Sequence, residues 1–128
     1  MDFRLGSAIR DELDRREILN DCDIVAIAGA GKCLVSPEPS SWHACALEMV
    51  DLSKKLHEIK TLIIMNHTDC GAYGGRSAFE SKGVERDQHI ADMRAAQEVI
   101  KMRQPNLDVL LVLAHINDDG SIHFEDVR

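Results

Sequence analysis

The chain has few aromatic side chains and no hydrophobic run long enough to cross a membrane. Phe, Trp and Tyr make up 4% of its 128 residues. Its apolar stretches are far shorter than the roughly 20 residues that span a bilayer. The first residues include Asp2 and Arg4 rather than the apolar core of a signal peptide. We therefore expect a cytoplasmic protein that has no membrane partner.

Basic clusters and a disulfide pattern are also missing. The formal net charge is -7, and no basic run is longer than Arg15-Arg16 or Lys54-Lys55, which argues against a nucleic acid partner. The four cysteines are irregularly spaced, so we expect reduced thiols rather than a disulfide framework. A length of 128 residues, 45% of them hydrophobic, fits one domain that spans residues 1–128.

Hydrophobic periodicity alternates between helical and extended segments along the chain. The predicted helices span 7–17, run from Ser40 or Ser41 through Leu56, and span 84–102. The predicted strands span 24–28, 61–65, 109–113 and 121–127, with Pro37 and Pro39 keeping the stretch before the second helix irregular. A hairpin turn is expected over 117–120. This order predicts an α/β fold with an open, mostly parallel sheet, right-handed helical crossovers and a C-terminal antiparallel hairpin strand.

His67 and Cys70 stand three residues apart where the apolar run Thr61–Met65 ends. The carboxyl edge of a parallel sheet is the place where ligands and catalytic groups collect. An imidazole nitrogen and a thiolate at this spacing can share one zinc ion, and Gly71 lets the backbone turn tightly beside them. The pair therefore predicts half of a zinc site.

Other interpretations of these segments stay open at this point. His67 could be a core histidine and Cys70 a buried thiol. Cys33 could replace a missing zinc ligand, although a small buried hydrophobic residue is the simpler interpretation. The run Gly29-Ala30-Gly31-Lys32 invites a phosphate-loop interpretation. That motif needs glycine at Ala26, Ser or Thr at Cys33 and a helix that begins at once, so we reject nucleotide binding.

The two ends of a family pattern are present in the chain. Asp2 and Arg4, followed by His67, Cys70 and Gly71, resemble the β-class carbonic anhydrase pattern of Cys-x-Asp-x-Arg and His-x-x-Cys-Gly. The first zinc cysteine of that pattern would stand immediately before the first residue of this chain.

The resemblance extends beyond the two motifs. The segment 23–31 is similar to the family's second strand and glycine-rich loop, and 109–127 is similar to its last strand pair. The resemblance covers nearly the whole chain, which looks like the family core without its opening strand.

The resemblance implies a zinc enzyme that converts carbon dioxide reversibly to bicarbonate and a proton. His67 and Cys70 would be zinc ligands, with Asp2 a third through a carboxylate oxygen. In the family the arginine, here Arg4, orients the aspartate, which in turn orients the attacking oxygen. The Gly71 amide would help to hold the bicarbonate oxygens. Because family members commonly dimerise, we expect a homodimer or a larger homo-oligomer.

Two alternative functions remain open from the sequence. The absent cysteine favours a non-catalytic relative that keeps the fold for binding zinc or a small anion. A hydrolase of a carbon dioxide analogue, such as carbonyl sulfide or carbon disulfide, would use the same residues, because these substrates have nearly the same shape.

Overall fold

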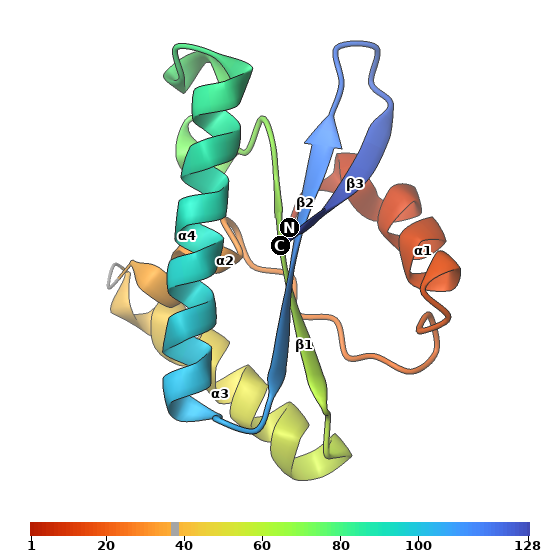
Figure 1. Ribbon diagram of the computed structural model, residues 1–128, viewed down its shortest axis with the longest axis vertical. Coiled ribbons are helices and arrows are strands. Elements are labelled where there is room, and N and C mark those ends of the chain that lie inside the picture. Colours follow the sequence, from red (N-terminus) through yellow and green to blue (C-terminus); the bar gives the residue numbers. More distant parts are fainter. Residues whose placement is uncertain (37–38) are drawn as a thin grey trace.

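Three strands form the sheet of the computed structural model, which describes residues 1–36 and 39–128 (Figure 1). They are β1 (Thr61–His67), β2 (Asp108–Ile116) and β3 (Ile122–Val127), and their order in the sheet is β1-β2-β3. β1 and β2 are parallel, whereas β2 and β3 are antiparallel. The predicted α/β class, with a helical crossover and a final antiparallel hairpin strand, is confirmed, but the sheet is mixed rather than mostly parallel, because the predicted strand over 24–28 does not join it.

The crossover from β1 to β2 is made by α4 (Lys82–Arg103), the longest helix that the structure describes. It begins where predicted within two residues, because the Ser81 hydroxyl accepts a hydrogen bond from the Val84 amide at 3.2 Å. Its residues Met93, Ala96 and Ile100 are fully buried against the sheet. This packing holds α4 against the sheet.

Helices cover both faces of the sheet (Figure 1). α2 (Gly31–Val35), α3 (Ser40–His57) and α4 lie on one face, and α1 (Gly6–Arg15) lies on the other, after a 3-10 turn over Phe3–Leu5. Leu5 packs with Ala114 and Ile116 of β2 in a small second core. This contact brings the first residues of the chain to the carboxyl end of the sheet.

The predicted strand over 24–28 is wrong. Residues 22–27 have no regular structure, and Ile24 and Val25 are 67% and 51% exposed. A β-rich sequence forms a strand only when a neighbouring strand pairs with it. Among the described residues, β1 pairs with β2 alone. The segment therefore stays outside the sheet.

Helix α2 was not predicted, since the stretch before α3 was expected to be irregular. Gly31 allows the start of α2 to lie close against β1. A Cβ at that position would come within 3.0 Å of the Asn66 amide oxygen and 3.2 Å of an Ile64 methyl. Pro39 precedes α3 in extended backbone, as its ring requires. The expectation for Pro37 lies outside the described residues.

None of the helices in the described part of the chain combines the length and the apolar character needed to cross a bilayer.

Glu125 ties β3 to α4 and gives stability a pH dependence. Its carboxylate accepts hydrogen bonds from Arg86 Nε at 3.0 Å and faces His115 Nε2 at 2.8 Å. The Arg86 hydrogen bond is the main cause that lowers the Glu125 pKa to about 2. Because the folded pKa lies below the unfolded one, this stabilisation is present above about pH 4.3 and is lost as pH falls toward 2.

We expect Glu125→Gln to lower the free energy of unfolding by about 1 kcal/mol at pH 7, a figure reduced for the solvent exposure of Arg86. The difference from wild type should nearly vanish at pH 2, as urea denaturation at the two pH values would show. Glu98→Gln, at an exposed position of α4, is the control. An equal loss at both pH values would contradict this account.

Candidate active site at the carboxyl end of β1

The candidate site lies where β1 ends and the chain turns toward α4. Asn66, His67 and Thr68 are buried there, and a short 3-10 helix over Gly71–Tyr73 follows Cys70. The Thr68 hydroxyl accepts a hydrogen bond from the Ile116 amide at 2.9 Å, which ties this turn to the end of β2. His67 is the last residue of β1 and Cys70 follows three residues later, so both lie at the strand end where the sequence placed them.

His67 and Cys70 are both buried, at 8% and 5% exposure, and each side chain shifts the pKa of the other. His67 Nδ1 lies 2.9 Å from the Thr68 carbonyl oxygen. Because a carbonyl only accepts, Nδ1 carries the proton in this contact, which leaves Nε2 as the nitrogen that can take a further proton or bind a metal ion. Nε2 lies 3.8 Å from Asp2 Oδ2.

The two side chains shift each other's protonation. Burial opposes a charge on Cys70, but the hydrogen bond from His67 outweighs it together with the backbone amides of Ala72 and Tyr73, so the Cys70 pKa is lowered. Burial likewise opposes a charge on His67, but its contacts with Cys70 raise its pKa overall. In proteins, zinc is bound by cysteine as the thiolate and by histidine as the neutral imidazole, and a lowered Cys70 pKa favours the first of these forms.

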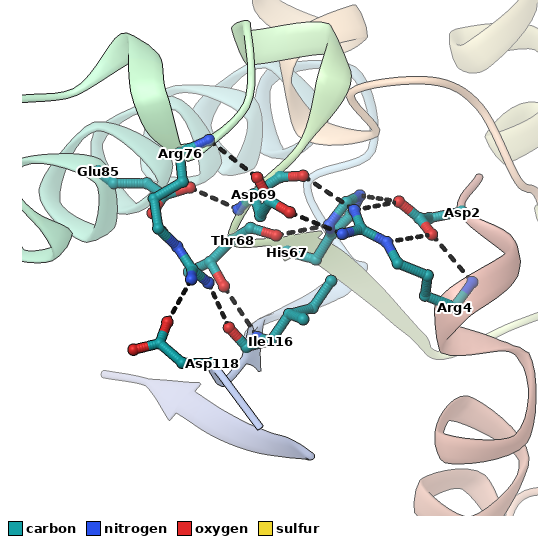
Figure 2. Close-up of polar contacts among 9 residues, drawn as sticks. All are labelled: Asp2, Arg4, His67, Thr68, Asp69, Arg76, Glu85, Ile116 and Asp118. Carbon is teal, nitrogen blue, oxygen red and sulfur yellow. Dashed lines mark hydrogen bonds and ion pairs between the residues drawn. The ribbon is translucent and has the colours of Figure 1, made fainter. Parts of the chain in front are cut away.

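Asp2 and Arg4 form a two-contact ion pair beside His67 (Figure 2). Arg4 Nε donates to Asp2 Oδ1 at 3.0 Å, and Arg4 Nη2 donates to Asp2 Oδ2 at 2.7 Å. The Arg4 hydrogen bond lowers the pKa of the Asp2 carboxyl to about 2. The Asp2 side chain is only 13% exposed, so these terminal residues are not ordinary solvated charges.

Asp69 is a site residue that the sequence analysis missed. Its carboxylate accepts from Arg4 Nη1 at 2.6 Å, and its carbonyl oxygen accepts from Arg4 Nη2 at 2.9 Å. The contact joins residues 65 apart in the chain. An aspartate between the two candidate zinc ligands was the available signal, but it does not identify its partner.

Gly71 and Cys33, the other candidates, lie near the same edge. Gly71 begins the 3-10 helix after Cys70, and a Cβ built on it would meet nothing within 4 Å. Open space therefore adjoins its backbone. Cys33 is buried and donates its thiol proton to the Ala28 carbonyl oxygen at 2.9 Å, and burial raises its pKa. This is the environment of a small buried residue rather than of a thiolate ligand.

One reason for rejecting a phosphate loop is wrong, because α2 does begin immediately at Gly31. The rejection still holds on other grounds. The Gly31 amide donates to the Asn66 side-chain oxygen at 2.9 Å, and the Lys32 ammonium donates to the Ala72 carbonyl oxygen at 2.7 Å. Both groups that a phosphate would need are used within the protein.

The residues of the site fit zinc in kind. His67 Nε2 and the Cys70 thiolate are preferred zinc donors, and the bond from Nδ1 to a carbonyl is the usual support for a ligating imidazole. Asp2 Oδ2, at 3.8 Å from His67 Nε2, is a further oxygen donor at the site. Among residues 1–36 and 39–128, no group of three or more His, Cys, Asp or Glu side chains is arranged to hold a metal ion. His67 and Cys70 are therefore two candidate donors rather than a complete set of ligands.

A family model described as "Putative carbonic anhydrase" matches residues 1–126. The chain belongs to this family. An uncharacterized protein of Rickettsia conorii is 27% identical over 116 residues, which are 88% of this chain and 62% of that protein. An uncharacterized protein of Rickettsia bellii is 30% identical over 125 residues, which are 95% of this chain and 75% of that protein. No solved structure matches the chain significantly.

The family match confirms the carbonic anhydrase resemblance that the two motifs indicated. The chain spans less than two thirds of the length of the Rickettsia conorii relative.

Proposed function

We propose that this protein catalyses the zinc-dependent, reversible hydration of carbon dioxide to bicarbonate and a proton. The observation that carries the proposal is the two-contact pair of Asp2 and Arg4, placed beside the buried His67 and Cys70. Membership of a carbonic anhydrase family supports it.

His67 and Cys70 would hold the zinc ion, and Asp2 is the nearest candidate for a further ligand. When bound, zinc lowers the pKa of water and so supplies a nucleophile near neutral pH. The buried position of both ligands keeps competing water away from them.

Asp2 and Arg4 would act on the attacking oxygen. In the active state Asp2 would be off the metal, and its Oδ2 would accept a hydrogen bond from the attacking oxygen and so aim the oxygen lone pair at the carbon of carbon dioxide. Arg4 keeps the carboxylate ionised and fixes its plane through two hydrogen bonds. The new carbon–oxygen bond gives bicarbonate, whose oxygens could be held by the Gly71 amide in the open space beside it.

Zinc titration and stopped-flow hydration together test this proposal. We expect the purified protein to bind about one zinc ion per chain and to hydrate carbon dioxide only when zinc is present. Elemental analysis of protein prepared without chelators gives the stoichiometry. A protein that binds no zinc at micromolar concentrations, or that is loaded but inactive, would contradict the proposed function.

A second function is favoured by one observation, the lack of a three-residue metal group in the described part of the chain. A non-catalytic family member would use the fold to bind zinc or a small anion. In that case the protein would take up zinc without hydrating carbon dioxide.

A third possible function is hydrolysis of a carbon dioxide analogue. Hydrolysis assays with carbonyl sulfide or carbon disulfide, run beside the hydration assay, would distinguish it from the other two.

We also propose that the protein is a homodimer or a larger homo-oligomer in the cytoplasm. β1 is an edge strand among the described residues, and Met1 and Phe3 are largely exposed near the site. Exposed strand edges and apolar side chains favour association. A monomer by light scattering at micromolar concentration would contradict this.

A further inference from the structure

Asp69 holds Arg4 from the side opposite Asp2 (Figure 2). Asp69 lies in the left-handed backbone region with φ of 55°, which a non-glycine residue adopts at a cost and which Asp tolerates better than most. Its carboxylate and its carbonyl oxygen both contact the Arg4 guanidinium. Two acceptors on one residue thus engage the same side chain.

Asp69 is itself held by the helix that packs on the sheet. Its backbone amide donates to Glu85 Oε1 at 2.5 Å, and Glu85, on α4, is only 1% exposed. Asp69 Oδ1 also accepts from the Arg76 amide at 3.0 Å. The aspartate that contacts Arg4 is therefore fixed to the body of the fold.

Arg76 connects the same turn to the β2–β3 hairpin. Its guanidinium donates to Asp118 Oδ1 at 2.6 Å and also contacts the Ile116 carbonyl oxygen. Figure 2 shows these contacts running from Asp118 through Arg76 and Asp69 to Arg4. The turn after β1 is thereby held from α4 and from the end of the sheet at once.

The Arg4 side chain needs this support because it lies in the first turn of the chain and is 35% exposed. Arg4 Nε and Nη2 donate to the Asp2 carboxylate. Arg4 Nη1 donates to the Asp69 carboxylate, and Nη2 also donates to the Asp69 carbonyl oxygen. Asp2 is two residues from Arg4, so the hydrogen bonds between them do not by themselves fix the pair relative to the end of β1. Among the described residues, Asp69 supplies the hydrogen bonds that tie this pair to a distant part of the sequence, while His67 Nε2 lies 3.8 Å from Asp2 Oδ2.

We infer that Asp69 is a positioning residue for the reaction: it fixes the Arg4 guanidinium, and through it the Asp2 carboxylate, relative to His67 and Cys70. The inference rests on the proposed function. It assigns no contact with the substrate to Asp69, which acts through Arg4.

Asp69→Asn is the sharpest test of this inference. Asn tolerates the left-handed backbone, but its amide has one acceptor oxygen where the carboxylate has two, so it cannot serve both Arg4 Nη1 and the Arg76 amide. We expect kcat for hydration to fall about 10-fold or more, with KM and zinc content unchanged. Asp51→Asn, at a carboxylate that pairs with Arg103 on another part of the surface, is the matched control and should leave all three values unchanged.

A spectroscopic signature separates positioning from a loss of stability. In wild-type protein the contacts with Asp69 should slow rotation of the Arg4 guanidinium, giving distinct Nη1 and Nη2 signals in ¹⁵N NMR spectra. In Asp69→Asn these signals should merge. If that variant does not fold, Asp69→Gly, which suits φ of 55° and lacks the carboxylate, replaces it and should show the same changes.

The two readouts distinguish failure of this inference from failure of the proposed function. Unchanged Arg4 signals, or an unchanged kcat in an active wild-type background, would overturn the role of Asp69. Merged signals in a protein whose zinc-loaded wild type does not hydrate carbon dioxide would overturn the proposed function, and with it the catalytic part of the inference.

Discussion

Asp2→Asn is expected to lower the rate of carbon dioxide hydration by about 10- to 100-fold while leaving the zinc content unchanged. Asp2 uses both carboxylate oxygens on Arg4, at 3.0 and 2.7 Å. The amide of Asn has only one oxygen, so its NH₂ group would face either the guanidinium or the attacking oxygen. Either arrangement places donor against donor or removes the acceptor that aims the nucleophile. Stopped-flow rates and elemental analysis measure the two effects separately.

The controls for this prediction use the same terminal region. Asp11→Asn changes an exposed carboxylate of α1 and should retain wild-type activity. Arg4→Lys should be nearly as costly as Asp2→Asn, because an ammonium lacks the planar fork that contacts both Asp2 and Asp69. Full activity in Asp2→Asn would mean that positions 2 and 4 carry ordinary charges, and the family roles would have to be withdrawn there.

The parts of the fold that the sequence predicted are those with strong local signals. Clear hydrophobic periodicity is present in β1, β2, α3 and α4. Ser81 caps the start of α4 by accepting a hydrogen bond from the Val84 amide. Residues 24–28 have equally strong strand propensity, but the described sheet offers them no partner strand. Strand formation depends on pairing that a local pattern does not contain.

The site was predictable in its types of residue but not in its connections. His67 and Cys70 could be paired from their spacing at a strand end, whereas the motif resemblance was needed to bring Asp2 and Arg4 to them. Asp69 and Glu85 were missed because their roles depend on contacts that the fold creates. The Asp69 amide reaches Glu85 across 16 residues, and the Asp69 carboxylate reaches Arg4 across 65.

Cys70→Ala should abolish measurable zinc binding at micromolar concentrations. Carbon dioxide hydration should be lost with it, which makes this the second large expected effect. Only two preferred zinc donors lie together in the site, so removing one leaves His67 alone. The folded metal-free protein should lose little stability, because the change removes one sulfur atom from a site at the edge of the core. Isothermal titration with zinc, followed by urea denaturation without metal, measures both quantities.

Two further cysteine variants complete the Cys70 experiment. Cys45→Ala, at an exposed position of α3, should bind zinc as wild type does. Cys33→Ser should also retain binding, because Cys33 donates its proton to the Ala28 carbonyl oxygen and burial raises its pKa, so it is a poor source of a thiolate. Loss of zinc in Cys33→Ser would identify Cys33 as the ligand that the sequence pattern lacks. Zinc binding that survives in Cys70→Ala with wild-type affinity would instead remove Cys70 from the metal site, and the proposed zinc centre at the end of β1 would fall with it.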